Sequence, residues 1–264
     1  MTDGGRLVAV VPVRMGSSRL PKKPLLCLGG KPLLSHILER VRRCRAVDDI
    51  VVATATTPEN DAIEAYCRAF GVACFRGAEE DVLGRLLAAL DALDATTGLL
   101  VFGDQPLIDP GILTTLIDRF HAAGGAYDLV GNDMVTTFPP GMDAEVFKVS
   151  ALRDAARNCS ENAIREHGTL FIRQNPGRYR VLNVEAEGFS RRPELELEID
   201  TSEDVKVVTA VLDHFGTDTD VRLDEIIRFL DANPNISRLN QSVPRRWKKF
   251  RNENDIPHSK QGRT

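Results

Sequence analysis

A basic loop near the N-terminus could bind a polyanion. Within ten residues it carries four cations, one glycine and two hydroxyls: Arg14, Arg19, Lys22, Lys23, Gly16, Ser17 and Ser18. Glycine allows the backbone to approach a ligand closely, and successive amides can form a concave anion-binding nest. This composition is typical of a triphosphate cradle. A solvated basic loop is the alternative, and composition alone does not decide between the two.

Two aspartates follow apolar segments and could bind a metal ion. Asp104 comes directly after the apolar segment 99–103, and Asp200 comes directly after the alternating segment 195–199. Carboxylates at the carboxyl ends of strands face the ligand-binding edge of an open α/β sheet. Hard oxygen ligands suit Mg²⁺, which usually keeps waters and substrate phosphates in its shell. A turn cap is the alternative for Asp104, and a helix N-cap is the alternative for Asp200. Asp109, which precedes a proline, is expected to be an N-cap.

The elements that must position these groups alternate between short apolar runs and amphipathic segments. The unbroken apolar run 7–13 predicts a strand buried on both faces. Further strands are predicted at 50–54, 72–75 and 99–102, and helices at 31–44, 58–71 and 80–93. This alternation predicts an α/β fold with a mainly parallel sheet and helices on both faces. The basic loop then follows the first strand, at the ligand-binding edge.

The second half of the chain is less regular. Strands are predicted at 127–131, 145–149, 180–184 and 195–199, and helices at 151–158, 161–174, 201–215 and 223–230. Over residues 194–199 three glutamates, Glu194, Glu196 and Glu198, alternate with apolar residues and are expected to form a solvated face. We expect one domain over 1–215 and a short helical and basic extension over 216–264. Its end, from Arg245 to Arg251, is expected to be a solvated tail, with docking of Trp247 and Phe250 as the alternative.

The sequence Arg14-Met-Gly-Ser-Ser-Arg-Leu-Pro-Lys-Lys-Pro resembles the N-terminal signature of cytidylyltransferases that activate sugar acids. These include the 3-deoxy-manno-octulosonate and acylneuraminate enzymes. It is more similar still to the spore-coat polysaccharide biosynthesis cytidylyltransferase homologues. The resemblance extends in patches from residue 7 to about residue 214. It implies a Rossmann-like nucleotide-diphospho-sugar transferase fold in which this loop holds the phosphates of CTP.

The resemblance also implies roles for the charged residues. Gly103-Asp-Gln-Pro-Leu-Ile and Ile199-Asp-Thr-x-Glu-Asp resemble the family's metal-binding motifs, so Asp104 and Asp200 are expected to bind Mg²⁺. Arg14, Arg19 and Lys23 match triphosphate contacts, whereas Lys22 stands where the family often has glycine. The implied reaction transfers CMP from CTP to the anomeric hydroxyl of a 2-keto sugar acid and releases pyrophosphate, for surface polysaccharide biosynthesis.

Substrate recognition is implied in two further segments. Arg76-Gly77 and Asp81 lie in a segment that resembles the one closing over the nucleotide; a turn before an acidic helix start is the alternative. Asp143, Glu145, Arg165 and His167 lie in segments that resemble the spore-coat group. Asp143, Glu145 and His167 are expected to bind sugar hydroxyls, and Arg165 a substrate carboxylate. His167 is a candidate general base, although proton loss to water or a metal-bound group is preferred.

Composition excludes several classes of function. The 264 residues are 42% hydrophobic and 27% charged, which is typical of a soluble α/β domain. The net charge of −4 argues against general nucleic-acid binding. Because no apolar run is long enough for a membrane span or a signal peptide, a cytoplasmic location with reduced cysteines is expected. Apolar residues expected to be exposed on the central strands favour a homodimer.

Two alternative functions stay open. The Walker pattern is absent, and Gly-x-Gly-x-x-Gly does not follow the first strand, which disfavours P-loop NTPases and dinucleotide-dependent dehydrogenases. A sugar-1-phosphate pyrophosphorylase would share the predicted architecture. A non-catalytic nucleotide-binding scaffold would retain the cradle without turnover.

Overall fold

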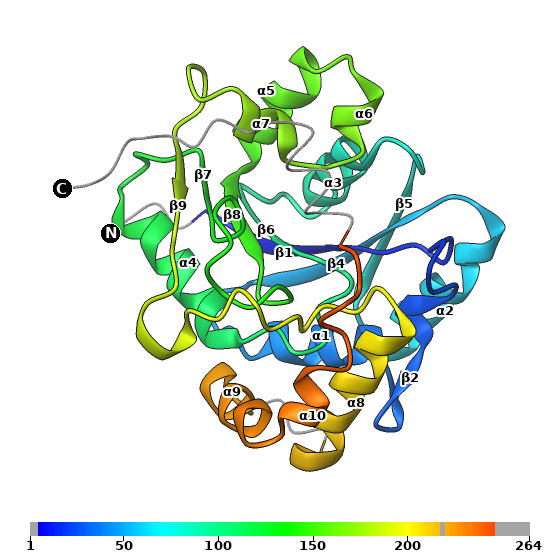
Figure 1. Cartoon of the computed structure of the whole chain (residues 1–264). Coiled ribbons are helices and arrows are strands. Elements are labelled where there is room, and N and C mark those ends of the chain that lie inside the picture. Colours follow the sequence, from blue (N-terminus) through cyan, green and yellow to red (C-terminus); the bar gives the residue numbers. More distant parts are fainter. Residues whose placement is uncertain (1–4, 217–219, 246–264) are drawn as a thin grey trace.

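The computed structural model describes residues 5–216 and 220–245. A seven-stranded sheet, in the order β5-β4-β1-β6-β8-β7-β9, forms the centre of this part of the chain (Figure 1). Its first four strands in this order are mutually parallel, and β8 runs antiparallel to both of its neighbours. The strands are β1 (Leu7–Pro12), β4 (Asp49–Ala55), β5 (Ala73–Gly77), β6 (Thr97–Val101), β7 (Leu129–Gly131), β8 (Ala144–Lys148) and β9 (Val181–Asn183). The predicted α/β class with a mainly parallel sheet is confirmed.

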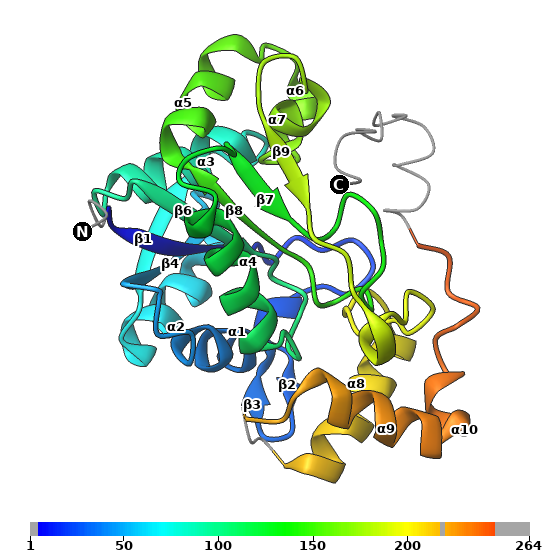
Figure 2. The same cartoon turned by 90° about the vertical axis from the view of Figure 1, so that its left-hand side faces the viewer.

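Helices cover both faces of the sheet (Figure 2). One face carries α1 (Leu33–Arg42), α2 (Asp61–Phe70), α4 (Pro110–Ala122), α8 (Ser202–Phe215) and α9 (Leu223–Ala232), as the residues of their shared core show. The other face carries α3 (Val82–Asp91), α5 (Val149–Asn158) and α7 (Leu170–Gln174), next to the short α6 (Asn162–Arg165). A small hairpin of β2 (Cys27–Leu28) and β3 (Lys31–Pro32) precedes α1.

Strand β1 lies between the two cores, as its unbroken apolar sequence predicted. Leu7, Ala9 and Val11 pack into one core, and Val8 and Val10 pack into the other. All five side chains are buried. Because side chains alternate across a strand, only a sheet covered by helices on both sides can bury every residue of this run. The basic loop therefore leaves the centre of the sheet at its carboxyl edge.

Several predicted elements differ in the structure. The segment 195–199 is buried but forms no strand, because its backbone bonds to loops instead: Leu197 N–H donates to the Pro140 carbonyl. The predicted helix 161–174 is divided into α6 and α7 at Gly168, whose φ of +57° interrupts it. The helix predicted from residue 31 begins at Leu33, since Lys31 and Pro32 pair with β2.

The C-terminal helices pack onto the main body. Leu223, Ile226, Ile227 and Leu230 of α9 belong to the same core as α1 and α4. After α10 (Pro234–Ser237), the segment up to residue 245 returns along α8 toward the sheet (Figures 1 and 2). The predicted docking of Trp247 and Phe250 lies outside the described residues.

Exposed apolar surface is sparse. Among the described residues, Phe189 and Leu239 are the exposed large hydrophobic side chains, and neither lies on a central strand. The apolar strand surface from which a homodimer was predicted is therefore covered by helices. Within the described ranges, none of the helices combines the length and the apolar character that a bilayer crossing demands.

Candidate active site

Asp104 and Asp200 are brought together by the backbone around them. The Ile199 N–H donates to the Asp104 carbonyl at 2.8 Å, which joins the segment before Asp200 to the end of β6. Gly103 lies so close to β1 that a Cβ there would be 2.5 Å from the Pro12 carbonyl oxygen. Only glycine permits this approach, which places Asp104 beside the loop that follows β1.

Lys23 connects the basic loop to both aspartates. Its Nζ lies 3.3 Å from Asp104 Oδ2, 3.1 Å from Asp200 Oδ1 and 2.8 Å from the Ile199 carbonyl oxygen. The side chain is only 13% exposed. Burial disfavours its charge, but the charges of Asp104 and Asp200 outweigh burial and raise the pKa of Lys23. Two carboxylates from distant parts of the chain thus share one cation.

Arg19 occupies the other side of Asp200. Its Nη2 donates to Asp200 Oδ2 at 2.5 Å. The alternative role of Asp200 as a helix cap is not found, because Thr201 is the N-cap of α8 and forms a capping box with Asp204. Asp109, in contrast, caps α4 as predicted and accepts from the Gly111 N–H. The Asp200 carboxylate is therefore directed at the basic loop.

The backbone of the basic loop turns back on itself. The Ser17 and Lys22 N–H groups both donate to the Met15 carbonyl, at 2.9 and 3.0 Å. The Ser17 amide is thus used inside the loop, whereas Gly16 and Ser18 are exposed. The anion nest predicted at residues 16–18 stays a prediction.

A cavity of about 430 Å³ opens beside the start of this loop. Arg14 stands at its edge, half-exposed and 3.6 Å from Glu79. The lining comes from the ends of β1 and β6, from α3 and from the turn before α7. Its apolar side includes Val82, Leu86 and Phe102. The cavity can therefore hold an organic group next to the cationic loop.

The floor of the cavity contains a buried ionic cluster that sequence reasoning missed. Arg173 Nη1 lies 2.8 Å from Asp133 Oδ2 and 2.9 Å from Glu145 Oε1. Glu145 also accepts from the Thr169 hydroxyl. Burial, together with the neighbouring Asp133 charge, raises the pKa of Glu145 to about 7. Glu145 was expected to bind a sugar hydroxyl, but it is fully buried, so it holds Arg173 instead.

Arg85 is a second cavity residue that sequence reasoning did not single out. Its Nη1 donates to the carbonyls of Ala78 and Glu79, at 2.5 and 3.0 Å. Burial and the nearby Arg14 charge lower the pKa of Arg85. The signal available in the sequence was a charged residue within the apolar stripe of the helix 80–93. Arg173, a cation in an otherwise apolar helix turn, carries the same signal.

Two residues expected to contact the nucleotide lie apart from the cavity lining. Arg76, on β5, pairs with Glu64 at 2.9 Å and with Asp61 at 2.7 Å, both on α2. It also donates to the Thr57 carbonyl. The Gly77 carbonyl accepts from the Thr56 N–H. In the structure, Arg76 and Gly77 thus join β5 to α2 and to the end of β4.

Asp81 and Arg165, predicted to serve different substrates, contact each other. Arg165 Nε and Nη2 donate to the two oxygens of Asp81 at 3.0 and 2.7 Å. Asp81 is also the N-cap of α3 and accepts from the Gly84 N–H at 2.8 Å. Burial opposes ionisation, but the Arg165 contact outweighs it and lowers the pKa of Asp81. Arg165 therefore pairs with this carboxylate rather than facing a substrate.

Asp143 lies beside Gln105, and His167 lines the cavity. Asp143 Oδ2 lies 3.5 Å from Gln105 Nε2, next to Asp104 in the chain. His167 lines the cavity together with Thr169 and Arg173. Partial burial, supported by the Arg173 charge, lowers the pKa of His167, so its neutral form is favoured at neutral pH.

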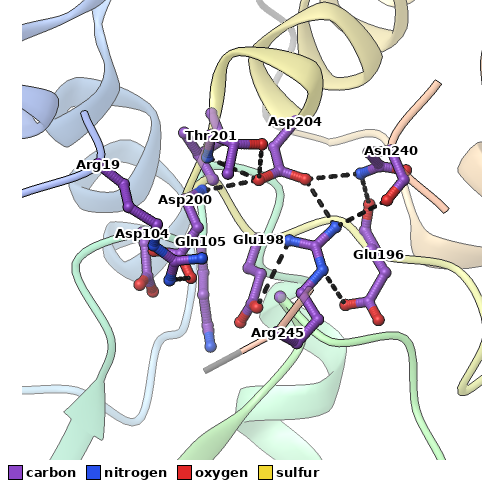
Figure 3. A network of polar contacts seen from close by, with 12 residues as sticks. Arg19, Asp104, Gln105, Glu196, Glu198, Asp200, Thr201, Asp204, Asn240 and Arg245 are labelled. Atoms are coloured by element: carbon purple, nitrogen blue, oxygen red, sulfur yellow. Dashed lines mark hydrogen bonds and ion pairs between the residues drawn. The ribbon is translucent and has the colours of Figure 1, made fainter. Parts of the chain in front are cut away.

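The acidic face predicted around Glu196 and Glu198 is not solvated. Both side chains are buried, and the Arg245 guanidinium lies between them and Asp204 (Figure 3). Glu194 alone is exposed as expected. Arg245 was assigned to a solvated tail, which is wrong for this residue, because its side chain is only 1% exposed. Burial and the charges of Asp104 and Asp200 raise the pKa of Glu198.

The donor set at the sheet edge fits a divalent cation. In the described part of the chain, no three His, Cys, Asp or Glu side chains are grouped as a ready-made metal site. Asp104 and Asp200 nevertheless converge on one positive charge, the Lys23 ammonium. Mg²⁺ typically takes one or two carboxylates and completes its shell with waters and phosphates. A pair of carboxylates beside a basic loop is sufficient for that arrangement.

Comparisons with known proteins show the family of this chain. A cytidylyltransferase family model matches residues 8–249. An uncharacterized protein of Methanocaldococcus jannaschii is 34% identical over 93% of this chain and 98% of its own length. The spore coat polysaccharide biosynthesis protein SpsF of Bacillus subtilis is 35% identical over 86% of this chain and 95% of SpsF. The 8-amino-3,8-dideoxy-manno-octulosonate cytidylyltransferase of Shewanella frigidimarina is 32% identical over only 47% of this chain and 51% of that enzyme.

Solved structures show the same architecture. A cytidylyltransferase from Leptospira borgpetersenii superposes with a TM-score of 0.85 at 28% identity, over 91% of this chain and all of that one. A CMP:2-keto-3-deoxy-manno-octonic acid synthetase complexed with CTP gives a TM-score of 0.61 at 20% identity, over 80% of this chain and 99% of that one. The second likeness shows the shared fold.

Proposed function

Because the chain belongs to the cytidylyltransferase family, we propose that it transfers CMP from CTP to the anomeric hydroxyl of a 2-keto sugar acid and releases pyrophosphate. The convergence of Lys23 with Asp104 and Asp200 at one sheet edge is the observation that carries this proposal. The relatives that act on octulosonates support the class of acceptor, and the relative in spore coat polysaccharide biosynthesis supports a role in surface polysaccharides.

In this proposal the basic loop binds the triphosphate. Arg14, Arg19 and Lys23 contribute three positive charges to this loop. As the bond between the α-phosphorus and the bridging oxygen breaks, these charges offset the charge that develops on pyrophosphate. Lys23 is the central group of the three, because its ammonium lies between Asp104 and Asp200.

Asp104 and Asp200 would hold a Mg²⁺ ion, which supplies Lewis-acid activation of a phosphate oxygen and a template for the substrates when it is bound. The sugar-acid hydroxyl oxygen forms a bond to the α-phosphorus, and pyrophosphate leaves with the electron pair of the broken bond. The hydroxyl proton passes to water. His167, which lines the cavity and whose neutral form is favoured, is the candidate protein base as the alternative to water.

The lining of the cavity supports the proposal that parts of both substrates bind there. Its lining combines α3 residues, from the segment that resembles a nucleotide-closing segment, with His167, from the segment that resembles the spore-coat group. Apolar side chains such as Val82 and Phe102 suit a base or sugar ring, and Arg173 offers donors to its oxygens. We place the organic parts of the substrates here and the phosphates toward Lys23.

The proposal is tested by pyrophosphate release from the purified chain with Mg²⁺. CTP is compared with the other three nucleoside triphosphates, and a panel of sugar acids is compared with sugar 1-phosphates. Release with CTP and a sugar acid supports the proposal. Release only with a sugar 1-phosphate indicates a pyrophosphorylase, and CTP binding without release indicates a scaffold.

The two aspartates give the decisive variants. Asp104→Asn and Asp200→Asn each remove one charge with almost no change of shape, so each should abolish Mg²⁺-dependent turnover. Asp109→Asn is the matched control, because Asp109 lies in the same connection between β6 and α4 as Asp104 but caps α4. This variant should retain turnover. Full activity in Asp104→Asn would exclude that residue as a metal ligand.

The homodimer and the cytoplasmic location stay proposals from the sequence, although helices cover the strand surface that favoured a dimer. Light scattering at micromolar concentration tests the dimer, and a monomeric mass would contradict it. Fractionation of cells that produce the chain tests the location.

A further inference from the structure

The last described segment, residues 238–245, lies next to the start of α8, which is close to Asp200 in the chain. After α10 it returns along α8 (Figure 1). Asn240 and Arg245 then donate to Asp204 in the first turn of that helix (Figure 3). Both side chains are buried, although the sequence around them is polar and basic. A buried arginine needs partners, and its partners show what the segment does.

The partners of Arg245 are three carboxylates. Its Nη2 lies 2.7 Å from Asp204 Oδ1, its Nε lies 3.5 Å from Glu196 Oε2, and its Nη1 lies 3.8 Å from Glu198 Oε1. All three carboxylates are buried. Figure 3 shows the guanidinium between them. One cation therefore separates three acidic groups that would otherwise repel one another.

Asp204 links the C-terminal segment to the backbone of Asp200. Its Oδ1 accepts from Arg245 and from Asn240 Nδ2, at 2.7 and 2.8 Å. Its Oδ2 accepts from the backbone N–H groups of Asp200 and Thr201, at 3.0 and 2.8 Å. Asp204 is thus clamped on one side by the C-terminal segment and holds the Asp200 backbone on the other (Figure 3).

We propose that Arg245 is a positioning residue for the reaction, because it fixes Asp204 and thereby the Asp200 carboxylate opposite Asp104. Arg245 contacts Asp204, Glu196, Glu198 and the Asn240 carbonyl, and it acts on Asp200 through Asp204. The segment that was predicted to be a solvated extension therefore completes the site. This inference rests on the proposed function for its effect on turnover, but its structural part does not.

The substitution Arg245→Met removes the charge and keeps most of the side-chain volume. Asp204 then loses its cationic partner but keeps its bonds to Asn240 and Thr201, so the acceptor of the Asp200 N–H is held less firmly. Partners that orient metal ligands typically contribute about tenfold or more to metal affinity or rate. We expect the Mn²⁺ dissociation constant in the presence of CTP to rise about tenfold and kcat to fall by a similar factor, with a smaller change in the KM for CTP.

The control is Arg238→Met, which removes an exposed arginine of the same segment. Arg245→Lys is the conservative variant; it keeps the charge and should recover part of both losses. It also serves where Arg245→Met fails to fold. The measurements are Mn²⁺ binding by electron paramagnetic resonance and hydrogen exchange of the peptide that contains Asp200 and Thr201, with melting temperature as the measure of global stability.

The expected result is faster exchange at Asp200 and Thr201 and weaker Mn²⁺ binding in Arg245→Met, with Arg245→Lys intermediate and Arg238→Met like the wild type. Unchanged local exchange and Mn²⁺ affinity would overturn the inference, and so would a lower melting temperature without these local effects. If the wild type binds no CTP and Mn²⁺, the proposed function fails, while the exchange measurement still decides the role of Arg245.

Discussion

Replacing Lys23 by methionine should have two opposite effects: it should lower the stability of the fold and strengthen the binding of a divalent cation. The ammonium contacts Asp104 and Asp200 and is 13% exposed, whereas the two carboxylates are 28% and 18% exposed. Removing one partner of a fully buried ion pair costs about 3–5 kcal/mol. Since these carboxylates keep some water and Asp200 retains Arg19, we reduce the expected loss of unfolding free energy to about 2 kcal/mol.

The same substitution should strengthen divalent-cation binding to the nucleotide-free protein. Lys23 Nζ occupies the place between the two carboxylates that a cation would take. Two unit charges 4 Å apart interact by about 1 kcal/mol in water and about 4 kcal/mol at the effective dielectric of a protein surface. Even the lower value, doubled for a divalent ion to about 2 kcal/mol, predicts about thirtyfold tighter Mn²⁺ binding.

The assay combines calorimetric Mn²⁺ titration without nucleotide and thermal unfolding with and without the ion. We expect Lys23→Met to unfold about 5 °C earlier, on the basis of about 2–4 °C per kcal/mol, and Mn²⁺ to restore most of this loss. Turnover should still fall, because the triphosphate loses a cation. Lys22→Met is the matched control, since the neighbouring lysine is exposed. A Lys23→Met protein with wild-type Mn²⁺ affinity would refute the competition between lysine and metal.

Three further outcomes follow from the contacts. Arg14→Ala should weaken CTP binding about tenfold, as expected for one charged hydrogen bond, and CMP binding far less; equal losses in a calorimetric titration would contradict a triphosphate role. Asp81→Ala should lower the unfolding free energy by about 2 kcal/mol through loss of the α3 cap and the Arg165 pair, and adding Arg165→Met should cost further only through its bonds to the Ala156 and Cys159 carbonyls, measured by denaturant unfolding. Folding raises the Glu145 pKa from 4.5 to about 7, so the native state binds the extra proton; the stability from this group is complete below pH 4.5 and declines as pH rises through 7, by about 3 kcal/mol. Glu145→Gln should remove that slope from the pH dependence of the denaturation midpoint, and a wild-type slope in the variant would assign it to another group.

Local sequence patterns were sufficient for the framework of the site. The apolar run from Leu7 predicted a strand buried on both faces, and the Gly103-Asp104 pair predicted a carboxylate at the sheet edge. Both follow from side-chain alternation and from the freedom of glycine, which depend on a few neighbouring residues. The segment 195–199 shows the limit of such patterns. Its alternation was real and its apolar residues are buried, but loops rather than a strand satisfy its backbone.

The partners of charged residues required the tertiary structure. Arg165 was expected to face a substrate and pairs with Asp81, and Glu145 was expected to face a sugar and holds Arg173. A sequence does not distinguish a charged side chain that faces a ligand from one that is paired inside the fold. Whether such a group is free for a ligand depends on which opposite charge the fold brings near it, often from the other end of the chain.

By itself, the sequence determined the α/β framework, the edge of the sheet at which ligands bind, and the basic loop and two aspartates that meet there. Only the tertiary structure decided that Lys23 joins those aspartates, that Arg85 and Arg173 line the cavity, and that Arg245 returns to clamp Asp204. The physical reason is range: helix and strand periodicity are set by neighbours in the chain, whereas burial and ion pairing are set by packing between segments far apart in it.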